Sequence, residues 1–161
     1  MYELLYTSHA AAALSEQQLV DILSVSRRHN AQHGITGLLI YHEQQIVQLL
    51  EGPKEQVLSL YERIYNDCRH QSVRVAYQNN ISQPAFSGWS MAFYDRNPSN
   101  VLEQLSGWED LSNSPQPCNL LVSASRNNLG NVGKDLLLIF QDEMKQSANA
   151  NNSALHLASA P

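Results

Sequence analysis

Short apolar runs alternate with two longer amphipathic segments over the first 95 residues of the chain. Runs rich in aromatic and branched residues predict five strands, at residues 2–8, 35–41, 45–52, 73–81 and 88–94. Apolar positions at helical spacing predict helices at residues 14–34 and 54–70. Ser15 and Gln18 match a capping box, and Gly34 matches a helix C-terminal stop. The order β-α-β-β-α-β plus a fifth strand predicts a ferredoxin-like α+β fold, with both helices on one sheet face.

The composition changes after residue 95. Residues 101–111 and 133–146 have apolar positions at helical spacing, so we expect a C-terminal helical extension over residues 96–146. Residues 147–161 are rich in Ala, Ser and Asn, which is typical of a disordered tail. The 161 residues therefore predict one domain at residues 1–95 with an appendage.

Gln48 is a polar residue in the middle of an apolar predicted strand. The side-chain period of two places it on the same face as Ile46 and Leu50. A buried primary amide without hydrogen-bond partners costs about 1–3 kcal/mol. The position of Gln48 in an apolar strand therefore predicts that other polar groups lie over this face of the sheet.

The apolar stripes of both predicted helices turn polar in their C-terminal halves. We expect the two helices to run in the same direction on the sheet, so that their polar halves meet at one end. The sheet beneath would carry Gln48 and Tyr6. Four polar side chains would line the walls of the resulting cleft: His29, Asn30, Arg63 and Asp67. Such a mixture of groups in an apolar cleft indicates a site for a flat heterocycle with polar edges.

Simpler interpretations exist for these residues. His29 and Asn30 could end in solvent at the helix terminus, where a histidine also favours the helix dipole. Arg63 and Asp67 are four positions apart, a spacing typical of an exposed ion pair. Tyr6 could be a core tyrosine whose hydroxyl binds a backbone carbonyl.

Charge and motif content exclude several classes of function. The formal net charge of -5 and the lack of a basic stripe disfavour nucleic acid. No apolar run approaches the roughly 18 residues of a membrane span, and no signal peptide is evident. Cys68 and Cys118 lack metal-type spacing, so we expect free thiols and a cytoplasmic location. His29 and His33 have no third zinc ligand, so no metal is expected.

Four segments, in order and with family-like spacing, resemble the BLUF family, the sensors of blue light using FAD. They read SRRHNAQHGITGLLIY, QIVQLLEGP, YERIYNDCRH and GWSMAF. The resemblance covers about residues 1–95 and implies a ferredoxin-like fold with a flavin between its two helices. It implies FAD as the cofactor, with FMN or riboflavin as other possible forms.

The resemblance also implies a role for each candidate residue. Tyr6 resembles the photoactive tyrosine, a donor of an electron and a proton to the excited flavin. Gln48 resembles the switching glutamine between this tyrosine and the flavin. Trp89 and Met91, which spacing alone interprets as packing residues of the fifth strand, resemble the pair that relays the signal. Cofactor contacts are implied for Tyr6, His29, Asn30, Gln48, Arg63 and Asp67.

The resemblance implies a blue-light photoreceptor that is not an enzyme and that signals to a partner protein. Short members of the family commonly assemble, so a homo-oligomer is expected. The main alternative is a ferredoxin-like flavin-dependent redox enzyme, and a further one is a ligand-sensing module without light chemistry. A hydrolase using His29 and Asp67 is disfavoured because no nucleophile in a recognisable motif accompanies them.

Overall fold

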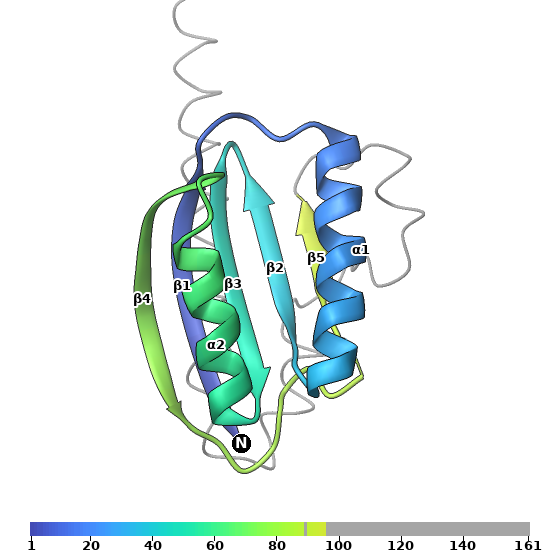
Figure 1. Ribbon diagram of the computed structural model, residues 1–161, viewed down its shortest axis with the longest axis vertical. Helices are drawn as coiled ribbons and strands as arrows, with labels where there is room; N and C mark the ends of the chain where they lie inside the picture. The colour runs from blue at the N-terminus through green and yellow to red at the C-terminus, as the bar shows by residue number, and fades with distance from the viewer. Residues whose placement is uncertain (89, 96–161) are drawn as a thin grey trace, which may run out of the picture.

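The computed structural model describes residues 1–88 and 90–95, so Trp89, the expected helical extension and the expected tail lie outside the described residues. Within them the chain forms five strands and two helices (Figure 1). Their bounds are β1 Tyr2–Ala10, α1 Glu16–His33, β2 Thr36–His42, β3 Gln45–Gly52, α2 Lys54–Tyr65, β4 His70–Asn80 and β5 Ala92–Asp95.

The strands form one sheet in the order β4-β1-β3-β2-β5. The first four are paired antiparallel, and β5 joins the edge of β2 in the parallel direction. Both helices cover the same face of this sheet (Figure 1). The predicted ferredoxin-like α+β fold is therefore confirmed, with β5 as an added edge strand.

The two faces of the sheet carry separate apolar clusters, as the period of two requires. Leu4 and Leu50 lie under the helices and pack with Leu23 of α1 and Val57 of α2. The opposite face has its own buried cluster of Leu5, Leu38, Ile40, Val47 and Leu49. The sheet is thus buried on both sides, which explains the almost continuous apolar runs in β2 and β3.

The two helices run in opposite directions, so the expectation that they run the same way is wrong. α1 leads from β1 back to the start of β2, which is parallel to β1. α2 leads from β3 to β4, and both of these strands run opposite to β1 (Figure 1). The polar halves therefore do not gather at one end, although the long Arg63 side chain still reaches His29.

The start and end of α1 follow the predicted signals. Ser15 Oγ accepts from the Gln18 backbone, the Gln18 side chain accepts from the Ser15 backbone, and Gly34 ends the helix at φ 64°. α2 ends at Tyr65, five residues before its predicted end. The Asp67 carboxylate accepts from the backbone N–H of Arg69 at 2.9 Å, a local bond that competes with helix.

The last two strands also differ from their predicted bounds. β4 begins at His70 because its pairing with β1 extends to the pair Ala10–His70. β5 begins only at Ala92, and residues 85–88 form a turn. The Glu51 carboxylate accepts from the backbone N–H groups of Ala85 and Phe86 at 2.7 and 3.0 Å, which gives this turn hydrogen-bond partners in place of a strand.

Candidate functional site

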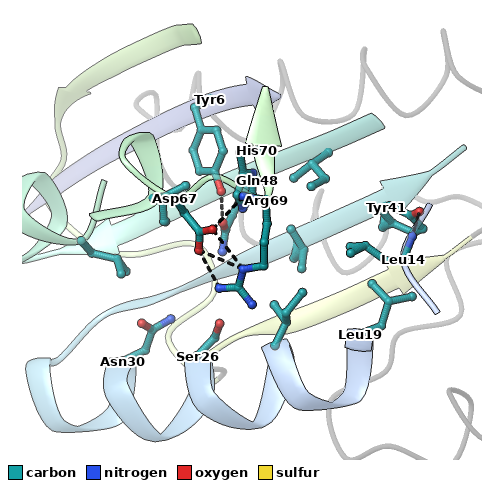
Figure 2. A pocket seen from close by; sticks show the side chains of 15 residues that line it. Tyr6, Leu14, Leu19, Ser26, Asn30, Tyr41, Gln48, Asp67, Arg69 and His70 are labelled. Carbon is teal, nitrogen blue, oxygen red and sulfur yellow. Dashed lines mark hydrogen bonds and ion pairs between the residues drawn. The ribbon is translucent and has the colours of Figure 1, made fainter. Parts of the chain in front are cut away.

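A pocket of about 110 Å³ lies between α1, α2 and the sheet. One buried water needs roughly 10–15 Å³, so this space admits a group much larger than one water. Leu14, Leu19 and Tyr41 line one end, whereas Asn30 and Asp67 line the other (Figure 2). An apolar slot with polar groups at one end is typical of a site for a small organic ligand.

Gln48 and Tyr6 meet on the sheet face beneath the pocket. They are direct cross-strand partners of β3 and β1, and the Tyr6 hydroxyl donates to Gln48 Oε1 (Figure 2). Burial is the main cause that raises the pKa of Tyr6 well above its usual value, so the phenol keeps its proton. Gln48 Nε2 donates to Met91 Sδ at 3.3 Å. The amide is therefore buried with a partner at each end, one of them a weak acceptor.

Asn30 projects from α1 into the pocket and is only 1% exposed (Figure 2). Its Nδ2 donates to the Ser90 backbone carbonyl at 2.8 Å. Its Oδ1 is buried and has no hydrogen-bond partner among the residues that the structure describes. An unpaired buried acceptor is costly, so this atom indicates where a ligand N–H could bind.

Asp67 faces the pocket and holds Arg69 in a two-point ion pair (Figure 2). Arg69 donates from Nε to Oδ1 at 3.0 Å and from its terminal nitrogen to Oδ2 at 2.6 Å. These bonds lower the pKa of Asp67 to about 2, so it is ionised at neutral pH. His70 is the next lining residue. Its Nδ1 lies 3.1 Å from Ser8 Oγ, and burial lowers its pKa.

His29 and Arg63 do not line the pocket. They contact each other, with an Arg63 terminal nitrogen donating to His29 Nε2 at 2.7 Å. Burial first, and then the nearby His33 and Arg63, lower the pKa of His29, so its ring accepts this bond in the neutral form. The expected ion pair of Arg63 with Asp67 is wrong because Asp67 lies beyond the end of α2 and binds Arg69.

The pocket thus brings together four of the candidate residues and includes others that the spacing argument missed. Tyr6, Asn30, Gln48 and Asp67 line it, and Met91 contacts it through Gln48. The missed polar lining residues are Ser26, Arg69 and His70. Ser26 lies on the polar continuation of the first helix, and the other two directly follow Asp67, so both signals were present in the sequence.

The fold and the pocket define a ligand-binding domain of the ferredoxin-like class, with its site between the helices and the sheet. Residues 1–92 match the sequence model of a family described as BLUF, sensors of blue-light using FAD. The chain therefore belongs to the BLUF family, which confirms the resemblance. The matched residues form strands β1 to β4, both helices and the pocket, and the match ends at the first residue of β5.

The chain is similar to proteins in which the matched region is a small part. It is 37% identical over 89 residues to the photoactivated adenylate cyclase subunit beta of Euglena gracilis, covering 55% of this chain and 10% of that protein. It is 36% identical over 70 residues to the blue light- and temperature-regulated antirepressor BluF of Escherichia coli (strain K12), covering 44% and 17%. The similarity is thus confined to a sensor-sized segment of these relatives.

A solved structure of a BLUF protein is matched over almost its whole length. It is described as BlrB, a BLUF protein in its dark state, and has 30% sequence identity to this chain. The match covers 78% of this chain and 96% of that one, with a TM-score of 0.59. Residues 1–92 are therefore a blue-light sensor domain of a flavin-using family, and the alternative of a flavin-dependent redox enzyme has no support in these similarities.

Neither α1 nor α2 is both long and apolar enough to cross a membrane. Residues 1–88 and 90–95 contain no group of three or more His, Cys, Asp or Glu side chains placed to hold a metal ion.

Proposed function

We propose that this protein is a blue-light photoreceptor that binds FAD in the pocket between α1, α2 and the sheet and passes a light-induced change to a partner protein. The position of Gln48 supports this proposal most directly. Its amide bridges a protonated phenol, Tyr6, and the thioether of Met91 at the base of a ligand pocket. An amide is both donor and acceptor, so it can satisfy two different arrangements at such a position.

The residues of the pocket fit the chemistry of a flavin ring. The polar edge of that ring has an N–H between two carbonyls, which suits the unpaired Asn30 Oδ1 as acceptor. Arg69, which is bonded to Asp67, and His70 add further donors to the lining, and the apolar lining suits the ring's methyl-bearing part. FMN and riboflavin share this ring, and we favour FAD because it is the flavin in the family description.

We assign the cofactor-binding role to the pocket residues Tyr6, Asn30, Gln48 and Asp67. His29 and Arg63 lie outside the lining, so we propose that they contact the part of the cofactor that projects from the pocket. Their paired nitrogen-bearing side chains suit a polar or anionic tail.

The proposed switch follows from the hydrogen bonds of Tyr6, Gln48 and Met91. A flavin held in this pocket would supply, on absorbing blue light, a strong oxidant for the phenol of Tyr6. Tyr6 would supply an electron and its hydroxyl proton, which already points at Gln48 Oε1, and would take both back as the amide settles in its new arrangement, so that no net oxidation results. A rotated Gln48 amide would turn Nε2 towards Tyr6 and its carbonyl oxygen towards Met91 Sδ. Oxygen and sulfur are both acceptors, so Met91 would lose its bond and be displaced.

The displaced Met91 would transmit the change because it directly precedes β5. We propose Met91 and Trp89 as the relay, residues 1–95 as the sensory domain, and the chain after Asp95 as the route to the partner. The cytoplasmic location, expected from the lone cysteines, and the homo-oligomeric assembly, expected from the family resemblance, belong to the same proposal. Catalysis, nucleic-acid binding and membrane insertion form no part of the proposed activity.

The absorption spectrum of the purified protein tests the proposal. The flavin-loaded protein should be yellow, and blue light should shift its visible band slightly to the red, with reversal in darkness. A protein that stays colourless after flavin is supplied would contradict the proposal. So would a yellow protein that is bleached by NADH but shows no reversible shift.

A further inference from the structure

Helix α1 holds the segment before β5 through two side chains that are three positions apart. Asn30 Nδ2 donates to the carbonyl of Ser90 at 2.8 Å, and Arg27 Nε donates to the carbonyl of Met91 at 3.0 Å. Residues three apart on a helix share one face, so both bonds can form at once. Met91 is therefore held at its backbone by α1 and at its sulfur by Gln48.

Arg27 has features that ordinary surface arginines lack. Its side chain is half-buried, and its NH2 atom is buried without a hydrogen-bond partner among the described residues. Burial also lowers its pKa, although an arginine remains charged at neutral pH. A hydrogen bond from a charged donor to a carbonyl is stronger than one from a neutral donor. The unpaired NH2 group of Arg27 can in addition bind a second acceptor. Its neighbour Arg28 is exposed.

We propose that Arg27 is a positioning residue that holds the Met91 backbone against α1 in darkness. It thereby keeps the Met91 side chain buried and its sulfur in contact with Gln48. Met91 is 1% exposed, although it lies in an irregular segment outside the regular strand ladder. Met91 also packs in the core cluster, Ala92 after it pairs with Leu38, and Asn30 bonds Ser90 before it, but Arg27 is the side chain that bonds the Met91 backbone itself. Removing the Arg27 donor should therefore let Met91 leave its buried position more often.

The role of this bond in signalling rests on the proposed function, whereas its role in burying Met91 does not. If light turns the Gln48 amide, the sulfur loses its partner while the carbonyl is still held by Arg27. Release of the segment then requires the Arg27 bond to break as well. Arg27 would thus set how readily the displaced state forms and how quickly the buried state returns.

The rate at which dilute hydrogen peroxide oxidises Met91 in darkness measures how often this side chain leaves its buried position. A thioether becomes a sulfoxide only where the oxidant reaches it. The test uses the full-length flavin-loaded protein and mass spectrometry of the Met91 peptide, with Met1, which is 49% exposed, as internal reference. We expect Arg27→Leu to speed Met91 oxidation roughly tenfold, the effect of one bond worth about 1.4 kcal/mol. Arg28→Leu is the matched control and should match the parent protein.

Arg27→Gln is the rescue variant, since its Nε2 is as many bonds from the backbone as the arginine Nε and keeps the donor. It should oxidise at Met91 more slowly than Arg27→Leu. Arg27→Ala also lacks the donor and replaces the leucine variant if that does not fold. An unchanged Met91 rate in the donor-free variants would overturn the proposal, and so would an equal rise in Arg28→Leu.

A light experiment tests the signalling part separately. Arg27→Leu leaves Tyr6 and Gln48 in place, so the red shift should persist, while its reversal in darkness should become severalfold slower than in Arg28→Leu. Equal reversal rates would overturn the signalling role of Arg27. A parent protein without any red shift would contradict the proposed function, yet the dark oxidation result would still decide whether Arg27 holds Met91.

Discussion

Gln48 combines burial with two unequal hydrogen bonds. The Tyr6 hydroxyl is a strong donor to its carbonyl, whereas the Met91 sulfur is a weak acceptor for its amide nitrogen. A typical net hydrogen bond contributes about 0.5–1.5 kcal/mol, so the weaker one restrains the amide little. The residue is therefore held firmly at one end and loosely at the other, which suits a side chain proposed to rearrange.

Replacement of Gln48 tests whether its amide is the group that rearranges in light. We expect Gln48→Ala to retain flavin, since Asn30, Asp67 and the apolar lining remain, but to lose the light-induced red shift. Absorption spectra before and after blue light measure both properties. Gln45→Ala, at the exposed start of the same strand, is the control and should keep the shift. A normal shift in the Gln48 variant would remove its proposed switching role.

The β2–β3 hairpin is the element that places Gln48 in the pocket. Its two-residue turn has positive φ at Glu43 and Gln44, as type I′ hairpins require, and it sets the register of the strands. In that register Gln48 lies opposite Tyr6 on one side and Leu39 on the other. A slip of one residue would turn Gln48 to the other face of the sheet.

Gly37 permits the close approach of β2 to β3 that this register needs. A Cβ atom at position 37 would lie 2.0 Å from the Leu49 carbonyl oxygen, which belongs to the strand backbone. We expect Gly37→Ala to lower the free energy of unfolding by about 1–3 kcal/mol or more, as overpacking does. Urea denaturation measures this. Gly88→Ala, whose Cβ would meet nothing within 4 Å, should change stability far less.

Protonation of half-buried histidines should make the stability of the whole molecule depend on pH. Burial lowers the pKa of His70 and of His29 below the usual value near 6.5. The unfolded chain therefore binds protons at a higher pH than the folded one. The part of the folding stability that depends on neutral His29 and His70 is fully present above about pH 6.5. It is lost progressively as the pH falls towards their lowered pKa values.

Thermal unfolding at two pH values tests this prediction. The melting temperature should be lower at pH 5.5 than at pH 7.5, and His70→Gln should reduce that difference without abolishing it, because His29 also contributes. His9→Gln replaces an exposed histidine at the end of β1 and is the matched control. An equal pH dependence in the parent protein and the His70 variant would contradict the role assigned to burial of His70.

The local pattern of the chain determined most of the fold and the need for a polar site. The spacing of the apolar positions predicted every strand and helix of the described residues. The cap residues Ser15 and Gly34 predicted the bounds of α1. The position of Gln48 within an apolar strand predicted a buried amide that needs partners, because side chains alternate along any strand. These features depend only on neighbours in the sequence, so they can be derived without a tertiary structure.

Only the tertiary structure decided which distant groups meet. The opposite directions of α1 and α2 follow from strand pairing, and they separate the polar helix halves that spacing alone had brought together. The early end of α2 turns Asp67 towards Arg69, and the late start of β5 brings the Met91 backbone to Arg27. Residues 64 positions apart, as in that last pair, carry no mutual signal in a periodic pattern, because their contact depends on how whole elements pack.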